Sequence, residues 1–284
     1  MNSDPRDNGH GRVGSELNVF GHSPTAKPAV VAPANLWLSR PRPNPRAQIR
    51  LIAFPYAGAG ASAFYPWANL LPQTIELCCL QLPGREGRLA ELPFTRIPEI
   101  VQAAAEAILP MLDRPFAFYG HSLGALISFD LARRLNEQYD ISPLHLFVSG
   151  HDAPHLIPER TSIHALPQTA FVDELKRING TPSEVFAHQD LMELMLPILR
   201  ADFEAAETYV YCHSGPVRCP IAALGGLEDD YISPERLKAW ASHTIGGFAL
   251  HMFPGGHFYL NAHRRLLLNI IIRTLQRYLV IENH

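Results

Sequence analysis

The chain has 284 residues, of which 47% are hydrophobic and 18% are charged. This length suits one large α/β domain, and the apolar share excludes a disordered chain because it is sufficient to build a core. With 24 basic and 27 acidic residues the formal net charge is −3, so no basic field is present to hold a nucleic-acid backbone.

The first 34 residues predict a flexible tail ahead of one folded domain at residues 35–284. This stretch holds four prolines and four glycines and has no sustained hydrophobic period. Its polar start lacks the apolar core of a secretory signal, and no apolar run in the chain reaches the roughly 18 residues that a membrane span needs. We therefore expect a cytoplasmic protein without a membrane helix. Residues 40–46 (RPRPNPR) predict a solvated, proline-stiffened linker leading into the domain.

Short apolar runs bounded by glycine or proline follow, and they predict strands buried on both faces. Adjacent Cys78 and Cys79 lie in the second run, where a strand points them to opposite faces as reduced core thiols. Between the runs, helical patterns occur, and Ser233-Pro234 forms an N-cap and first-turn pair for the third helix. The alternation predicts an α/β fold with a mostly parallel, doubly wound sheet. The predicted strands are 49–56, 75–83, 115–122, 144–150, 220–226 and 248–256, and the predicted helices are 95–112, 123–139, 234–243 and 261–279.

The segment from about 160 to 212 interrupts this alternation, because it shows helical pattern and no convincing strand. Its clearest feature is an apolar stripe at helical spacing, which is more typical of packing than of a ligand site. A helical insertion between two core strands predicts a lid over the sheet edge. The stripe consists of Leu191, Leu194, Met195, Ile198 and Leu199.

The sharpest motif is Gly120-His121-Ser122-Leu123-Gly124, which follows a predicted strand and precedes a predicted helix. This is the context that G-x-S-x-G requires to form a nucleophile elbow, in which the glycines leave room for a tight, strained turn. The helix that follows directs its N-terminal amides toward developing negative charge. The motif predicts Ser122 as a nucleophile.

A serine hydroxyl needs a base, and the base needs an orienting carboxylate. Hydrolases of this fold place the acid after a late strand and the histidine near the end of the chain. Here Asp229 and Asp230 follow the strand ending in Gly-Gly, and His257 follows Pro-Gly-Gly after the last strand. Spacing alone does not choose between the two aspartates. Among 14 histidines only His257 combines a glycine-flanked loop with this order, and no metal-binding motif accompanies it.

The loop after the first core strand admits two interpretations. Its Gly58-x-Gly60-x-x-Ala63 spacing loosely matches a dinucleotide fingerprint, which would indicate an oxidoreductase. The next strand, however, ends in LCCLQLPG without the acidic residue that binds ribose. The alternative, which we favour, is that this loop supplies one oxyanion-hole N–H while Leu123 supplies the other.

From about Leu36 to its end, the chain resembles the type II thioesterases, the stand-alone α/β-hydrolase enzymes that accompany polyketide synthases and non-ribosomal peptide synthetases. LPGRE and LRADF are not general hydrolase features, which makes the resemblance specific. The matching segments are WLSRPRP, LIAFPYAGAGAS, LQLPGREGRLAE, FYGHSLGA, LFVSGHDAP, LMELMLPILRADFEAAETY, ALGGLEDDYIS and FPGGHFYL.

The resemblance implies an enzyme that hydrolyses acyl groups from the phosphopantetheine thiol of carrier proteins, clearing stalled or misprimed chains without a cofactor. It implies Ser122 as nucleophile, His257 as base and Asp229 as acid, with oxyanion donors at Leu123 and, by preference, Ala57. Two alternatives are a small-molecule esterase or lipase, disfavoured by LPGRE and LRADF, and an inactive hydrolase-fold binding protein, disfavoured by the complete triad. The chain departs from the family at His151-Asp152, where a basic pair is more usual.

Overall fold

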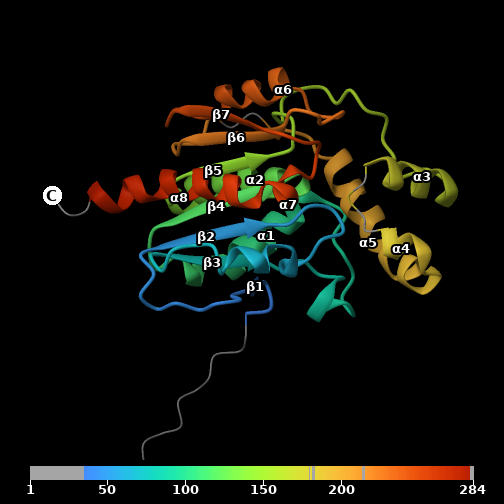
Figure 1. Ribbon diagram of the computed structural model, residues 1–284, viewed down its shortest axis with the longest axis horizontal. Coiled ribbons are helices and arrows are strands. Elements are labelled where there is room, and N and C mark those ends of the chain that lie inside the picture. The colour runs from blue at the N-terminus through green and yellow to red at the C-terminus, as the bar shows by residue number, and fades with distance from the viewer. Residues whose placement is uncertain (1–34, 179, 181–182, 213–214, 282–284) are drawn as a thin grey trace, which may run out of the picture. The chain divides into compact units, whose positions relative to one another are not determined.

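A computed structural model describes residues 35–178, 180, 183–212 and 215–281, so the predicted tail at 1–34 lies outside the described residues. The described strands form a single seven-stranded sheet in the order β1-β3-β2-β4-β5-β6-β7 (Figure 1). All strand pairs are parallel except β1 with β3. The mostly parallel, doubly wound sheet predicted from the sequence is therefore confirmed. The strands are β1 (Leu38–Ser39), β2 (Ile49–Phe54), β3 (Ile75–Leu80), β4 (Phe116–His121), β5 (Leu146–Ser149), β6 (Ile221–Gly226) and β7 (Phe248–Phe253).

The six predicted strands are all present, and β1 is an additional edge strand that the sequence did not indicate. It has only two residues and pairs through Leu38 with Leu80 and through Ser39 with Cys79. Two residues are too few to show a hydrophobic period, so pattern analysis could not find it.

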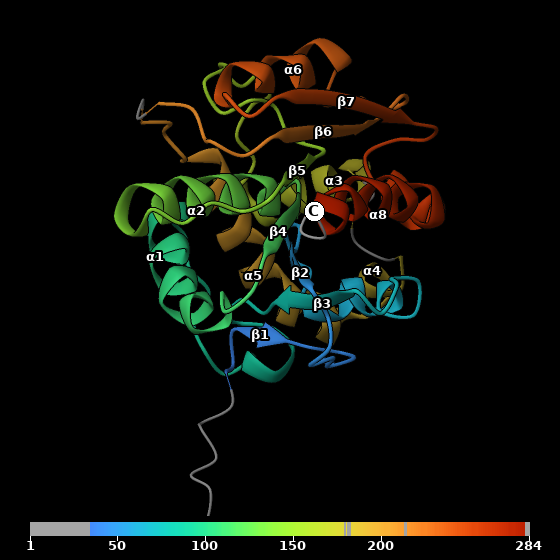
Figure 2. The ribbon, with the colours of Figure 1, turned by 90° about the vertical axis from the view of Figure 1, so that its left-hand side faces the viewer.

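Helices cover both faces of the sheet, as Figure 2 shows with α1 and α2 on one side and α8 on the other. Cys78 belongs to the core packed under α1 and α2, and Cys79 to the core packed under α8. Both thiols are free and buried, as predicted. These helices are α1 (Ile97–Ile108), α2 (Leu123–Tyr139), α6 (Pro234–Lys238), α7 (Tyr259–Ala262) and α8 (Arg264–Ile281).

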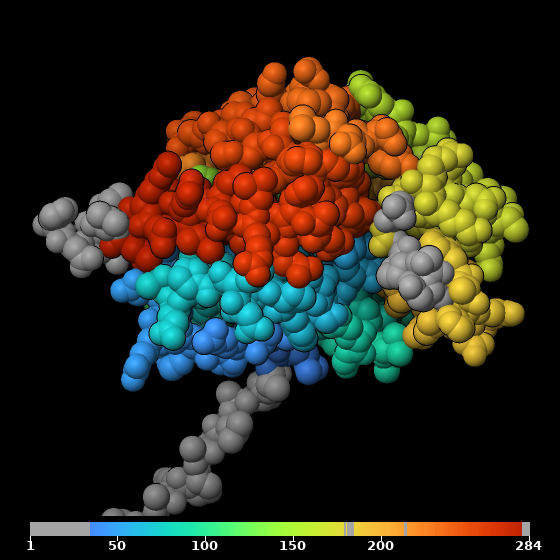
Figure 3. Space-filling view, in the orientation of Figure 1, coloured from blue at the N-terminus to red at the C-terminus, as the bar shows by residue number. Residues whose placement is uncertain are grey.

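The segment between β5 and β6 contains α3 (Gln168–Ile178), α4 (Ser183–Ala187) and α5 (Gln189–Glu207) and, among its described residues, no strand. These helices project beyond the carboxyl ends of the strands (Figure 1), and in the space-filling view they protrude at the same side of the molecule (Figure 3). The predicted stripe on α5 is only half covered, because Ile198 and Leu199 are buried whereas Leu191 and Leu194 are 43% and 44% exposed. Among the described residues, no helix is long and apolar enough to cross a bilayer.

The proline-rich stretch at 40–46 is largely exposed to solvent, as its composition predicts, but it is not a free linker. The carboxylate of Glu76 on β3 is fully buried, and it accepts hydrogen bonds from the Arg40 guanidinium and from the backbone N–H of Asn44. The Nε–H of Arg50 on β2 also donates to the Glu76 carboxylate, at 3.0 Å. A buried carboxylate requires such compensation, so this stretch is tied to the sheet by a charge that local sequence does not reveal.

His145, just before β5, is buried beside Tyr278 of α8, and its Nδ1 lies 3.2 Å from the tyrosine hydroxyl. Burial, with smaller contributions from His251 and Arg277, lowers the pKa of His145 to about 4. The unfolded chain takes up this proton near pH 6.5 and the folded chain does not, so the free energy of unfolding falls as the pH drops through this window.

We expect this histidine to cost the parent about 2 kcal/mol of stability between pH 7 and pH 5. The substitution His145→Gln keeps a partner for Tyr278 and removes the titration, so its unfolding free energy should lose about 2 kcal/mol less over the same interval. Urea unfolding of both proteins at the two pH values measures the difference. An identical pH dependence in parent and variant would contradict the assignment.

Candidate active site

Ser122 lies in the turn that joins β4 to α2, with φ +52° and ψ −116°. This left-handed backbone is costly for a residue other than glycine, and its neighbours hold it in place. A Cβ on Gly120 would lie 2.1 Å from the carbonyl oxygen of Gly124, and a Cβ on Gly124 would lie 2.1 Å from that of Phe54. Only glycine fits at both flanks, so the turn has the strained geometry that the motif predicted.

His257 and Asp229 come together from the loops after β7 and β6. The Nδ1–H of His257 donates to Oδ2 of Asp229 at 2.8 Å, and the second carboxylate oxygen accepts from the backbone N–H groups of Tyr231 and Ile232. The side chain of Asp229 is completely buried and that of His257 is 8% exposed. A carboxylate held on both oxygens fixes the orientation of the imidazole.

Asp230 takes no part in this contact, because it is exposed at the surface of the same loop. The two loops are joined by backbone hydrogen bonds, from Leu227 N–H to Phe253 O at 2.8 Å and from Glu228 N–H to Gly255 O at 3.0 Å. These bonds set the register in which Asp229 faces the histidine.

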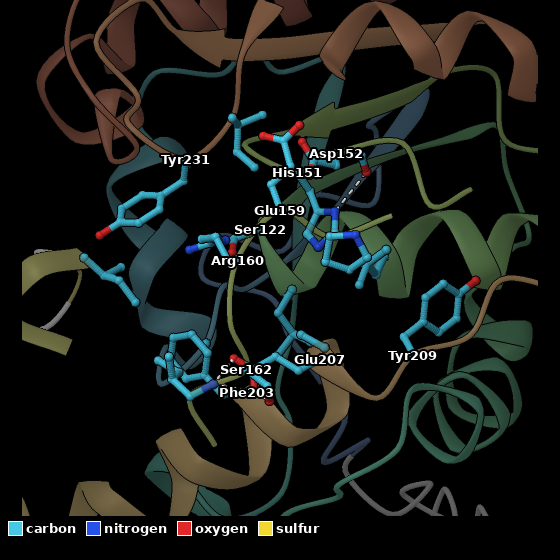
Figure 4. Close-up of a pocket in the computed structure, with 18 of the residues that line it drawn as sticks. Ser122, His151, Asp152, Glu159, Arg160, Ser162, Phe203, Glu207, Tyr209 and Tyr231 are labelled. Carbon is cyan, nitrogen blue, oxygen red and sulfur yellow. Dashed lines mark hydrogen bonds between the residues drawn. The ribbon is translucent and has the colours of Figure 1, made fainter. Parts of the chain in front are cut away.

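A cavity of about 650 Å³ opens beside Ser122 and lies between the sheet edge and the inserted helices. Figure 4 shows its lining, with Ser122 contributed by the elbow and Phe203 and Glu207 by α5. A smaller neighbouring cavity is lined by Ser122, Ala57 and His257 together. The hydroxyl and the imidazole therefore face a common space in which a reacting group can lie.

Ala57 and Leu123 both border the cavity beside Ser122. Ala57 lines both cavities, and Leu123, the first residue of α2, lines the larger one. Within the described part of the chain, neither backbone N–H donates a hydrogen bond to the protein. Both donors are available to an oxygen atom of a ligand, as an oxyanion hole requires.

A polar network beneath the histidine is a feature that the sequence analysis did not identify. His121 is fully buried, and its Nδ1 is hydrogen-bonded to Ser149 Oγ at 2.8 Å, which is in turn 2.6 Å from the Tyr259 hydroxyl. Burial, with smaller effects from His257 and His151, holds the pKa of His121 well below its ordinary value. The His121 ring lies 5.0 Å from that of His257, and its burial disfavours a positive charge on it. Only its place inside the motif pointed to it.

The oxidoreductase interpretation of the 58–63 loop is not supported by its geometry. A dinucleotide fingerprint leads into an α-helix, whereas this loop leads into a short 3₁₀ segment, Ala61–Trp67. The carboxylate of Glu86 accepts from the backbone N–H and hydroxyl of Ser62, where a phosphate would have to lie. Within the described residues, no three His, Cys, Asp or Glu side chains are grouped to hold a metal ion.

Comparison with known proteins gives consistent matches. The family described as Thioesterase domain matches residues 49–278. The gramicidin S biosynthesis protein GrsT of Aneurinibacillus migulanus is 42% identical over 246 residues, which are 87% of this chain and 96% of GrsT. The linear gramicidin dehydrogenase LgrE of Brevibacillus parabrevis is 44% identical, over 86% of this chain and 94% of LgrE. The solved structure of the type II thioesterase BorB from the borrelidin biosynthetic cluster is 38% identical with a TM-score of 0.78, covering 84% of this chain and 98% of BorB.

Proposed function

Because the chain belongs to the thioesterase domain family and is a thioester hydrolase, we propose that Ser122, His257 and Asp229 are its catalytic residues. The observation that supports this assignment most directly is the 2.8 Å hydrogen bond between the buried Asp229 carboxylate and His257, which shares a cavity with Ser122. Family, fold and site geometry all favour acyl transfer over a dehydrogenase reaction, although one relative carries a dehydrogenase name.

In the proposed mechanism, Ser122 Oγ attacks the thioester carbonyl while its proton passes to Nε2 of His257. Asp229 stabilises the imidazolium, and the N–H groups of Ala57 and Leu123 bind the oxyanion. Collapse of the tetrahedral intermediate breaks the carbon–sulfur bond, and His257 protonates the leaving thiolate. Water, deprotonated by His257, then attacks the acyl-serine ester. Collapse of this second intermediate breaks the bond between the acyl carbon and Oγ, and His257 returns the proton to Ser122, so that the products are a free acid, a free thiol and the regenerated enzyme.

The proposed substrate is an acyl group on the phosphopantetheine arm of a carrier protein, released during polyketide or non-ribosomal peptide synthesis. The relatives named for gramicidin S and borrelidin biosynthesis support this choice. The cavity supports it as well, because the inserted helices cover the nucleophile and leave about 650 Å³ for an acyl chain. We propose that α3, α4 and α5 form the lid predicted for residues 160–212, and that a carrier protein contacts its outer face.

The direct test compares hydrolysis of one acyl group on a carrier protein and on a short thiol, with product release followed by mass spectrometry. We expect a higher kcat/KM for the carrier protein because its surface adds binding interactions. The exposed acids Asp190 and Glu193 lie at the start of α5. The double variant Asp190→Lys with Glu193→Lys should change carrier-protein kcat/KM by about tenfold and leave short-thiol hydrolysis unchanged.

The matched control is Glu99→Lys with Glu106→Lys, which makes the same change of charge on the exposed side of α1, among residues that do not line the cavity. This control variant should hydrolyse the carrier-protein substrate and the short-thiol substrate at the rates of the parent. If the α5 variant changes kcat/KM equally for the two substrates, or for neither, then this face of the lid does not take part in carrier-protein recognition. A chain that hydrolyses short esters but no carrier-bound thioester would favour the esterase alternative.

A further inference from the structure

The LPGRE and LRADF segments contribute no residue to the proposed triad, yet the structure joins them through a buried ion pair. Arg85 of the first segment and Asp202 of the second, on α5, are 117 residues apart in the sequence. The guanidinium donates to both carboxylate oxygens, at 2.6 and 2.8 Å. Their side chains are only 4% and 1% exposed.

The Asp202 carboxylate has a further partner in the loop that carries Ala57. The backbone N–H of Gly58 donates to Asp202 Oδ2 at 2.7 Å, and Arg85 donates to the carbonyl oxygen of Ala59 at 3.3 Å. The ion pair therefore holds the two residues after Ala57, because Asp202 accepts a hydrogen bond from Gly58 and Arg85 donates one to Ala59. Ala57 and Gly58 are joined by one peptide bond, so the position at which Gly58 is held influences the direction of the neighbouring Ala57 N–H.

The loop also packs directly against α5. Gly58 has φ +76°, and a Cβ built on it would lie 2.5 Å from Leu199 Cδ2, one turn before Asp202. A side chain at residue 58 would thus strain the backbone and displace the loop from α5. Because glycine has no Cβ, the loop can lie close to α5, and this closeness brings the Gly58 N–H within hydrogen-bond distance of Asp202.

A stability role alone explains this arrangement poorly. Two charges lose their hydration on burial, and a well-packed apolar pair of similar volume often stabilises a protein equally or better. An apolar pair cannot, however, accept a hydrogen bond from Gly58. An oxyanion hole requires its donors within about 0.5 Å of their working positions, so a fixed acceptor beneath the loop has direct value for the reaction.

We propose that Asp202 is a positioning residue for the oxyanion hole: it holds the Gly58 N–H so that the neighbouring Ala57 N–H points at the substrate oxygen, and Arg85 holds Asp202. This inference rests on the proposed function, since it takes the Ala57 N–H as an oxyanion donor. It also gives a role to the LPGRE and LRADF segments, which lie outside the proposed triad, because each supplies one half of the pair.

The test uses two double variants of the full chain that both remove the charges. Arg85→Met with Asp202→Asn retains an amide oxygen that can accept from Gly58, whereas Arg85→Met with Asp202→Leu does not. We expect the leucine variant to have a kcat about 30-fold to 100-fold below that of the asparagine variant, with KM changed less than threefold. Each variant leaves one donor without its partner, the asparagine N–H₂ in the first and the Gly58 N–H in the second. The unfolding free energy is therefore measured for both, and a kcat difference that it does not follow is attributable to the acceptor.

A second readout separates positioning from folding. A trifluoromethyl ketone analogue of the acyl thioester adds to Ser122 and places its oxyanion in the hole, so its affinity should fall by the same factor as kcat/KM. The two double variants should differ little in unfolding free energy and in the pH dependence of kcat, so neither quantity should account for the loss of affinity. Equal kcat in the two variants, or a loss confined to KM, would overturn the role of Asp202. Ser122→Ala, assayed alongside, keeps the two proposals apart, because turnover that survives in it rejects the proposed triad and not the positioning role.

Discussion

Ser122→Ala is expected to lower thioester turnover on the order of 10⁴-fold or more while leaving the fold intact. The reason for the loss is that the acyl-enzyme cannot form without the hydroxyl. The reason for the intact fold is local, since among the described residues Ser122 Oγ forms no hydrogen bond and its removal leaves no buried partner unsatisfied. Alanine at φ +52° has the same backbone strain as serine.

Turnover of an acyl thioester and covalent labelling by a fluorophosphonate measure this effect independently. The parent should be labelled at one residue and the variant not at all. Ser142→Ala is the matched control, because Ser142 follows α2 and, among the described residues, its hydroxyl hydrogen-bonds only to Asn136, at 3.2 Å. Labelling that persists in Ser122→Ala would identify another nucleophile and reject the assignment.

Asp229→Asn is expected to lower kcat about 10⁴-fold, whereas Asp230→Asn should stay within about tenfold of the parent, a barrier change of about 1.4 kcal/mol. In the first variant the amide oxygen can still accept from Tyr231 and Ile232, so the loop is kept. Its N–H₂ group then faces Nδ1 of His257 and favours the tautomer with hydrogen on Nε2, which cannot accept the serine proton.

Both variants carry the same change in charge and composition, one residue apart, so each controls for the other. Circular dichroism and unfolding free energy should be close to the parent in both. A severe loss of kcat in Asp230→Asn with a mild one in Asp229→Asn would show that the loop adopts another register when substrate is bound.

The fold was predictable where the pattern is local and repeated. Six strands appear as short apolar runs, and in five of them every residue is buried. β7, at the edge of the sheet, is only partly covered, so the burial on both faces that its apolar run predicted is wrong there. The Ser233 cap is confirmed by its hydrogen bond from the Arg236 N–H at 3.3 Å. Local composition is misleading where a long-range contact overrides it. The arginines and prolines of 40–46 are typical of a linker, and the buried Glu76 that binds this stretch lies more than 30 residues later in the chain.

The site divides in the same way. A glycine-flanked serine between a strand and a helix, and a late histidine after Pro-Gly-Gly, can be found in the sequence because backbone geometry itself demands those residue types. The choice between Asp229 and Asp230 could not be derived from spacing, because adjacent residues differ only in which way the loop turns them. That direction depends on hydrogen bonds between the β6 and β7 loops.

Local patterns thus account for the strands of the sheet and for the elbow, because each depends on residues close together in the chain. The order of serine, acid and histidine spans residues 122–257, and it could be found because each of these residues follows a strand that is itself recognisable. Spacing left Asp229 and Asp230 open and the family resemblance implied Asp229, but the contact with His257 is visible only in the tertiary structure. The tertiary structure is also what brings Arg85 and Asp202 together beneath the Ala57 loop. The physical reason is that burial makes an unpaired charge costly, and the partner that relieves this cost is chosen by the packing of distant elements, which no local pattern records.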